Sequence, residues 1–190
     1  MKKIIFVIAM LFMLSACSPS VYIEKDKVTD VQFVKLKMDL YGNASNEPYY
    51  RQELTVVKEI DKNDSVSYRL YDVNTMKDKS FELDSKKMYL IIDDDIYPLE
   101  NDYEKRYNDQ QISEKKEDVM KSDSTKISVV SGYNVVNEKV YQMIHPIANE
   151  TMAQISHARE VALRYTAGPD FLNSEIQGRN LINLKILINK

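Results

Sequence analysis

The sequence predicts an α+β fold: a mostly antiparallel, twisted β-sheet with two short helices near the C-terminus packed on one face. Three observations predict it. Apolar and polar residues alternate in several segments between residues 31 and 99, turn-forming clusters separate these segments, and apolar residues recur at helical spacing after residue 149. The 190 residues, of which 44% are hydrophobic, include only four Gly and five Pro, so the composition is that of a globular protein.

The first predicted strands lie between residues 31 and 70. Leu36, Met38 and Leu40 alternate with polar residues, which is typical of a strand with one buried face. The runs 54–60 and 66–70 repeat the pattern. The cluster 61–65 between them has turn chemistry, so these two runs predict a hairpin.

A second hairpin is predicted around three consecutive acidic residues. The apolar runs 88–92 and 96–99 flank Asp93-Asp94-Asp95 at hairpin spacing, and Pro98 favours an edge position for the second run. Phe81-Glu82-Leu83 predicts a further short strand.

Residues 100–126 differ in composition from the rest of the chain. They hold eight acidic and six basic residues with few apolar positions. This pattern predicts either a solvated helix around Tyr103 and Tyr107 or a mobile insertion, because so few apolar groups cannot offset the entropy of ordering.

The last third of the chain predicts four strands and two helices. The strands are expected at 127–136 and 140–147, joined near Asn137-Glu138, and at 161–165 and 171–176, joined by a turn at 167–170. One helix of about ten residues is expected to begin at Asn149 as its N-cap. Leu181, Leu184 and Ile188 predict the second, at 180–189, with one buried face.

The N-terminus has the pattern of a signal peptide. Lys2 and Lys3 precede an uninterrupted apolar run, Ile4 to Leu14, that is shorter than the roughly twenty residues of a spanning helix. The run ends in Leu14-Ser15-Ala16-Cys17, and Cys17 is the only Cys of the chain. These four residues closely resemble the lipobox of bacterial lipoproteins.

The resemblance implies that Cys17 carries lipid. Its thiolate would take a diacylglyceryl group as a thioether, a peptidase would cut before it, and fatty acids such as palmitate would anchor the mature chain to the membrane. Several acyl chains on one residue make a stable anchor without a transmembrane helix. Ser18 leads us to expect the outer membrane if the cell is Gram-negative, since an Asp there resembles an inner-membrane retention signal.

The expected organisation is therefore a signal peptide at 1–16, a lipidated N-terminus and tether at 17–30, and a single domain at 31–190 with a charged insertion at 100–126. The net charge of −3, with bases and acids interspersed, argues against a nucleic-acid partner.

Few residues stand out as candidates for chemistry. His145 and His157 lack metal-ligand spacing and are interpreted as surface or half-buried structural residues. The turn Asp93–Asp95 is either a solvated turn or a calcium site. Arg159 and Arg164 could clamp an anion, although Arg164 is more simply interpreted as pointing to solvent or to Glu175 across the hairpin.

Thirteen Tyr and no Trp are the other notable feature of the composition. On strands they predict either ordinary cross-strand packing or an exposed platform for a protein or glycan. The sequence contains no GxSxG motif and no Gly-rich phosphate motif, so we expect no enzymatic activity, no cofactor and no metal. The expected function is the binding of a protein or surface polymer in the envelope. The alternatives are a lipoprotein holding a small apolar or glycan molecule and an envelope hydrolase.

Overall fold

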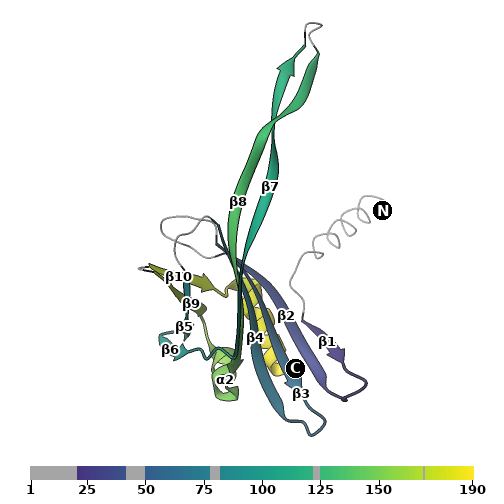
Figure 1. Ribbon diagram of the computed structural model, residues 1–190. Coiled ribbons are helices and arrows are strands. Elements are labelled where there is room, and N and C mark those ends of the chain that lie inside the picture. Colours follow the sequence, from purple (N-terminus) through teal and green to yellow (C-terminus); the bar gives the residue numbers. More distant parts are fainter. Residues whose placement is uncertain (1–20, 42–49, 78–81, 122–124, 169) are drawn as a thin grey trace, which may run out of the picture.

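The computed structural model describes residues 21–41, 50–77, 82–121, 125–168 and 170–190 (Figure 1). The expected signal peptide, Cys17 and Ser18 lie outside the described residues, as does Phe81. The described strands are β1 (Tyr22–Lys25), β2 (Gln32–Tyr41), β3 (Tyr50–Ile60), β4 (Val66–Lys77), β5 (Leu83–Ile92), β6 (Asp95–Pro98), β7 (Tyr103–Met120), β8 (Lys126–Ile147), β9 (Val161–Ala167) and β10 (Asp170–Glu175). The described helices are α2 (Asn149–His157) and α3 (Gly178–Asn189).

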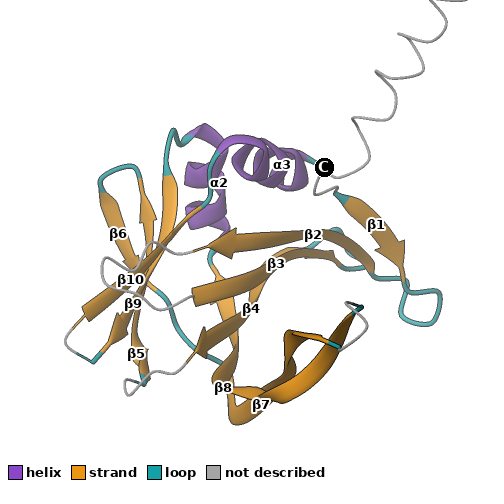
Figure 2. Cartoon of the chain, turned by 90° about the horizontal axis from the view of Figure 1, so that it is seen from above, coloured by secondary structure: helices purple, strands orange, loops and turns teal. Residues whose placement is uncertain are grey.

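The strands form two antiparallel sheets rather than one. The first has the order β1-β2-β3-β4-β8-β7 and the second the order β10-β9-β5-β6. Figure 2 shows the smaller sheet beside the curved six-stranded sheet, with α2 and α3 next to each other. The fold is thus mostly antiparallel β-structure with two helices near the C-terminus, which confirms the coarse prediction.

Alternation along the strands builds the core. On β2, Val34, Leu36, Met38 and Leu40 are at most 3% exposed, because successive side chains of a strand point to opposite faces. The core cluster combines residues from both sheets and from both helices, among them Leu54, Leu90, Leu163, Met152 and Leu184. One continuous core therefore holds the two sheets together.

The sheet begins earlier than the sequence pattern suggests. Tyr22–Lys25 pair with residues 32–35 of β2, inside the segment expected to be a tether. The side chain of Asp26 accepts a hydrogen bond from the Val28 backbone N–H at 2.8 Å, which closes the turn that follows. Polar strands at sheet edges need no apolar alternation, so periodicity did not predict this one.

Two predictions for the middle of the chain are wrong. Residues 103–120 form strand β7, so the helical alternative for 100–126 is excluded, while the mobility of this segment stays a prediction. The strands expected at 127–136 and 140–147 are one strand, β8, because Asn137 and Glu138 continue its pairing with β7.

The predicted start of the first helix is wrong by one residue. Ala148 occupies the N-cap position of α2, and Asn149 is the first helical residue. The Asn149 amide instead donates a hydrogen bond to the carbonyl oxygen of Val66 at 3.1 Å, so it ties the helix to the start of β4.

Candidate functional site: the protruding hairpin and its base

The hairpin of β7 and β8 projects from the rest of the molecule (Figure 1). β4 pairs with β8 only from Glu138 to Ile147, so among the described strands β7 alone pairs with the earlier part of β8. We call residues 110–137 the arm and the remaining described residues the body. A strand advances about 3.3 Å per residue, so β7 from Gln110 to Met120 extends the arm by about 35 Å.

The two strands of the arm differ in composition. Residues 127–137 of β8 contain no charged side chain and include five Val or Ile. The facing part of β7 contains the charged run 114–118. Because β-branched residues favour strands, β8 supplies most of the strand propensity, and β7 follows by pairing with it.

Polar cross-strand contacts hold the arm together at its surface. The Gln110 amide donates to the Asn137 side-chain oxygen at 2.9 Å, and the Ser131 hydroxyl donates to the Lys115 carbonyl oxygen at 3.2 Å. Both contacts are exposed, so each contributes little to stability. An isolated two-stranded hairpin is only marginally stable in water.

The arm exposes apolar side chains on one of its faces. Ile112 lies directly opposite Val135, and Tyr133 lies two residues further along the same face. Their exposed fractions are 65%, 51% and 66%. These side chains add nothing to the core, and grouped exposed apolar residues of this kind mark binding surfaces.

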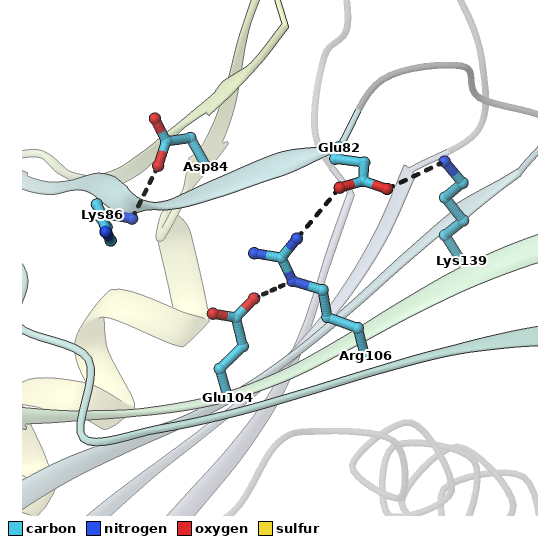
Figure 3. Close-up of polar contacts among 6 residues, drawn as sticks. All are labelled: Glu82, Asp84, Lys86, Glu104, Arg106 and Lys139. Atoms are coloured by element: carbon cyan, nitrogen blue, oxygen red, sulfur yellow. Dashed lines mark hydrogen bonds and ion pairs between the residues drawn. The ribbon is translucent and has the colours of Figure 1, made fainter.

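Charged residues cluster where the arm leaves the body (Figure 3). The Arg106 guanidinium contacts Glu104 and donates to Glu82 Oε2 at 3.2 Å, and Lys139 Nζ lies 4.0 Å from Glu82 Oε1. Arg106 belongs to β7 and Lys139 to β8, whereas Glu82 directly precedes β5 of the other sheet. The Glu82 carboxylate therefore links the base of the arm to the smaller sheet.

The ion pair of Glu104 and Arg106 favours the charged form of both groups. Burial raises the pKa of Glu104, but hydrogen bonds from Arg106 and Ser85 outweigh it and bring the pKa below its ordinary value. The same hydrogen bond with Glu104 raises the pKa of Arg106. Nearby, Asp84 accepts the Lys86 backbone N–H at 3.1 Å, which shapes the irregular start of β5.

A cavity of about 310 Å³ lies beside these charges. Its lining includes Arg106, Lys139, Tyr107 and Tyr141. The Arg106 guanidinium lies 5.5 Å from the centre of the Tyr141 ring, so it stacks on an aromatic face as well as pairing with carboxylates. A charged and aromatic lining of this kind suits a polar ligand better than an apolar one.

A second cavity, of about 480 Å³, lies between the start of β9 and the start of α3. Its lining includes Asp93, Arg159, Glu160 and Glu175. Asp93 Oδ1 accepts the backbone N–H groups of Arg159 at 2.9 Å and Glu160 at 3.0 Å, and these bonds lower the pKa of Asp93. Asp93 therefore fastens the turn between β5 and β6 to the loop before β9.

A polar cluster is buried inside the body, between the sheets. The carboxylate of Asp72 accepts hydrogen bonds from Gln52 at 2.7 Å, Asn74 at 2.7 Å and the Tyr165 hydroxyl at 2.8 Å. Tyr165 comes from β9 and the other three from β3 and β4, so the cluster joins the two sheets. Burial raises the pKa of Asp72, although the bonds from Gln52 and Tyr165 and the nearby His145 act in the opposite direction.

His145 completes this buried cluster. Its Nδ1 lies 2.8 Å from the Glu100 carbonyl oxygen, and because a carbonyl can only accept, Nδ1 carries a proton. Its Nε2 lies 4.0 Å from Asp72 Oδ2. Asp72 and His145 are each 1% exposed, so a substrate cannot reach either group in this structure. The cluster is therefore a structural element, and His145 is more deeply buried than the sequence suggested.

The other residues singled out in the sequence are spread over the body. His157 is exposed at the end of α2. The predicted pair of Arg164 with Glu175 is wrong, because the register places Arg164 opposite Asn173, whose side-chain oxygen accepts from Arg164 Nε at 2.8 Å. Arg159 lines the cavity near the start of α3, whereas Arg164 donates to Asn173 on β10. The structure therefore does not bring the two arginines together as an anion clamp.

The tyrosines divide between the two interpretations. Tyr68, Tyr141 and Tyr165 are buried and belong to the core, as expected for cross-strand packing. Tyr107 and Tyr133 are exposed on the base and on the arm. A platform made only of tyrosines is not formed by these residues, although Tyr133 contributes to the apolar face of the arm.

Sequence reasoning missed the buried cluster, but the signal was present. On β4 the core-facing positions continue from Tyr68 and Leu70 to Asp72 and Asn74, and on β3 Gln52 precedes the core-facing Leu54. Extending the period of two past the apolar residues would have placed these polar side chains inside the core.

The described residues do not form a metal site or a membrane-spanning helix. Within the described ranges, no three His, Cys, Asp or Glu side chains are arranged to hold a metal ion. None of the described helices is both long enough and apolar enough to cross a membrane.

Comparison with protein-family models, with curated proteins and with solved structures finds no significant match.

Proposed function

We propose that this chain is a lipid-anchored envelope protein that has no enzymatic activity and that binds another protein or a surface polymer through its arm. The main support for this proposal is the geometry of the arm. It projects about 35 Å from the body by its residue count, and it presents Ile112, Tyr133 and Val135 to solvent at exposed fractions above one half. Selection for stability alone does not account for such a segment, because a two-stranded hairpin gains little from its own contacts.

The body is the scaffold in this proposal. Its continuous core includes Tyr141, Met143 and Ile147 of β8, and β7 is held by pairing with β8. The Glu82 carboxylate ties the base of the arm to the smaller sheet. We also infer that α2 and α3 pack together on one face of the six-stranded sheet, where the buried Leu184 and Leu187 would stiffen the scaffold behind the arm.

Lipid attachment at Cys17 is the second part of the proposal and rests on the lipobox resemblance. Growth with a fatty-acid probe is expected to label the wild-type chain but not Cys17→Ser. Equal labelling of the two chains would contradict the anchor. If the cell has an outer membrane, fractionation is expected to find the labelled chain there, as Ser18 indicates.

Site-specific photo-crosslinking in intact cells tests the binding role. A photoreactive residue replacing Ile112 on the arm is expected to give a discrete adduct. The matched control replaces Ile182 of α3, whose exposed fraction of 59% is close to the 65% of Ile112. Digestion of the adduct with a protease or with glycan hydrolases would tell a protein partner from a polymer. Equal adduct yields from the two positions would contradict a binding role for the arm.

One observation favours the alternative of a small glycan ligand over a small apolar one. The cavity at the base of the arm offers the exposed ring of Tyr107 beside the charged Arg106 and Lys139. Aromatic faces and charged donors suit sugar rings and their hydroxyl groups. Saturable binding of soluble oligosaccharides that is lost in Tyr107→Ala, with the arm crosslinks unchanged, would support this alternative.

A further inference from the structure

The two long edges of the arm are protected to different degrees. In the arm, β7 carries a continuous run of five acidic and basic side chains, 114–118, which includes Glu114, Lys115 and Lys116. The outer edge of β8 between residues 127 and 137 carries none, and among the described strands nothing pairs with it there. Proteins discourage pairing at exposed strand edges with charged side chains, above all Lys, and also with Pro and β-bulges. The β8 edge has no charge or Pro in this segment, and its register with β7 shifts once, at Ser131.

The β8 edge therefore has the properties of a pairing template. Its residues are rich in Val and Ile, it lacks Pro and charge, and Val130 and Val135 are 46% and 51% exposed. An uncharged strand of this composition pairs readily with another extended strand. In solution, such an unpaired edge is expected to bind another extended strand.

We infer that the occupant is a second copy of this chain, which pairs its own β8 edge antiparallel to the first. This inference names the partner of the arm and so rests on the proposed function. Antiparallel pairing of identical strands is self-complementary about a twofold axis. The two arms would then form one four-stranded sheet in the order β7-β8-β8-β7.

Charge and closure favour this partner over other arrangements of the same chain. Pairing β8 with β8 brings no like charges into opposition, because neither edge carries any between 127 and 137. It also covers both unprotected edges at once and leaves only the charged β7 edges outside. Pairing β8 of one copy with β7 of the next would leave one unprotected edge at every step and would grow into a filament.

Cysteine crosslinking of the full chain in its own envelope tests the inference. Cys17 is the only natural Cys and is expected to be blocked by lipid, so a single introduced Cys is the only free thiol. A scan of single Cys substitutions along 127–137 is expected to give disulfide-linked dimers whose yield peaks at one position and falls on both sides, because only residues near the twofold axis meet their own copies. The wild-type chain and a scan along 110–120 of β7 serve as controls and are expected to give no such peak.

A pair of matched charge variants tests the role of the edge. Val135→Lys is expected to abolish most of the dimer formed by the peak Cys variant, because it places two like charges at the shared edge. Ile112→Lys adds the same charge opposite it on the same face but on β7, and is expected to leave the dimer yield unchanged. Equal loss in both variants would overturn the edge pairing in favour of association through the face.

Other outcomes separate this inference from the proposed function. Uniform crosslinking along all of 127–137 would indicate parallel strands, and the absence of any peak would exclude the paired edge; either result overturns the inference. If the photoreactive residue at position 112 then gave an adduct with a different molecule, the arm would keep its binding role without a second copy. Failure of both experiments would overturn the proposed function as well.

Discussion

A single strand, β8, runs through two regions that differ in burial and in the number of strands that pair with it. In the body, from Glu138 to Ile147, six of its residues are buried, and polar His145 lies among them with its Nδ1 hydrogen-bonded. In the arm, the same strand has no buried residue from Lys126 to Asn137. The body half is positioned by β4, β7 and the core together, whereas the arm half is positioned by β7 alone among the described strands.

The difference shows what each half of the strand is used for. Burial of apolar area stabilises the body by roughly 25 cal/mol for each Å² removed from water, and the arm receives almost none of this contribution. The β-branched residues of the arm keep it extended but leave its side chains available. Side-chain changes in the body should therefore alter stability, and those in the arm should alter binding.

The largest expected effect comes from removing apolar volume in the body. Leu184 of α3 is 1% exposed, so Leu184→Ala is expected to lower the free energy of unfolding by about 2–5 kcal/mol. Ile112→Ala on the arm should change it by less than about 0.5 kcal/mol. Urea unfolding of both variants measures the contrast, and similar small effects would show that α3 is only loosely attached.

A second contrast uses two tyrosines. Tyr165→Phe removes a hydroxyl that bonds Asp72 and Gln52 in the buried cluster, and is expected to cost about 1–3 kcal/mol. Tyr133→Phe removes an exposed hydroxyl of the arm and is expected to leave the unfolding midpoint unchanged. A neutral Tyr165→Phe would mean that the cluster does not join the sheets.

The pH dependence of stability should come from the body as well. Burial raises the pKa of Asp72, so its contribution to stability is full below the pKa of the unfolded chain and is lost as the pH rises through the folded value. The wild type is therefore expected to lose stability relative to Asp72→Asn as the pH increases. Asp118→Asn, which removes one exposed carboxylate from the arm, is the control variant. A wild type that gains stability relative to Asp72→Asn with rising pH would contradict this account.

The smallest effect on global stability, but the clearest local one, is proteolysis. The arm opens more easily than the body because few buried contacts close it. Limited trypsin digestion is expected to cut first at Lys115, Lys116 or Lys121. First cleavage within 54–72 would show that the body, not the arm, contains the weakest segment.

The body was the more predictable region. Alternation on β2 and in the hairpin of β3 and β4 gave correct strands, and Leu181, Leu184 and Ile188 gave the last helix, because burial imposes its period on the sequence. Of the arm, the β8 half was predicted as a strand at 127–136, but the β7 half and its pairing were not, since a strand without a buried face has no such period. Its β7 half, with eight acids in 100–126, resembled a solvated segment, and only its pairing with the Val-rich β8 half makes it a strand.

Replacing the arm by a tight turn tests the division of roles most directly. Asp109 and Glu138 are direct cross-strand partners, so an Asn-Gly pair can join them in place of residues 110–137. The shortened chain is expected to unfold cooperatively with a midpoint close to that of the wild type, and to lose the higher-mass species that chemical crosslinking of intact cells traps with the full chain. A shortened chain that fails to fold, or that keeps those species, would contradict the account.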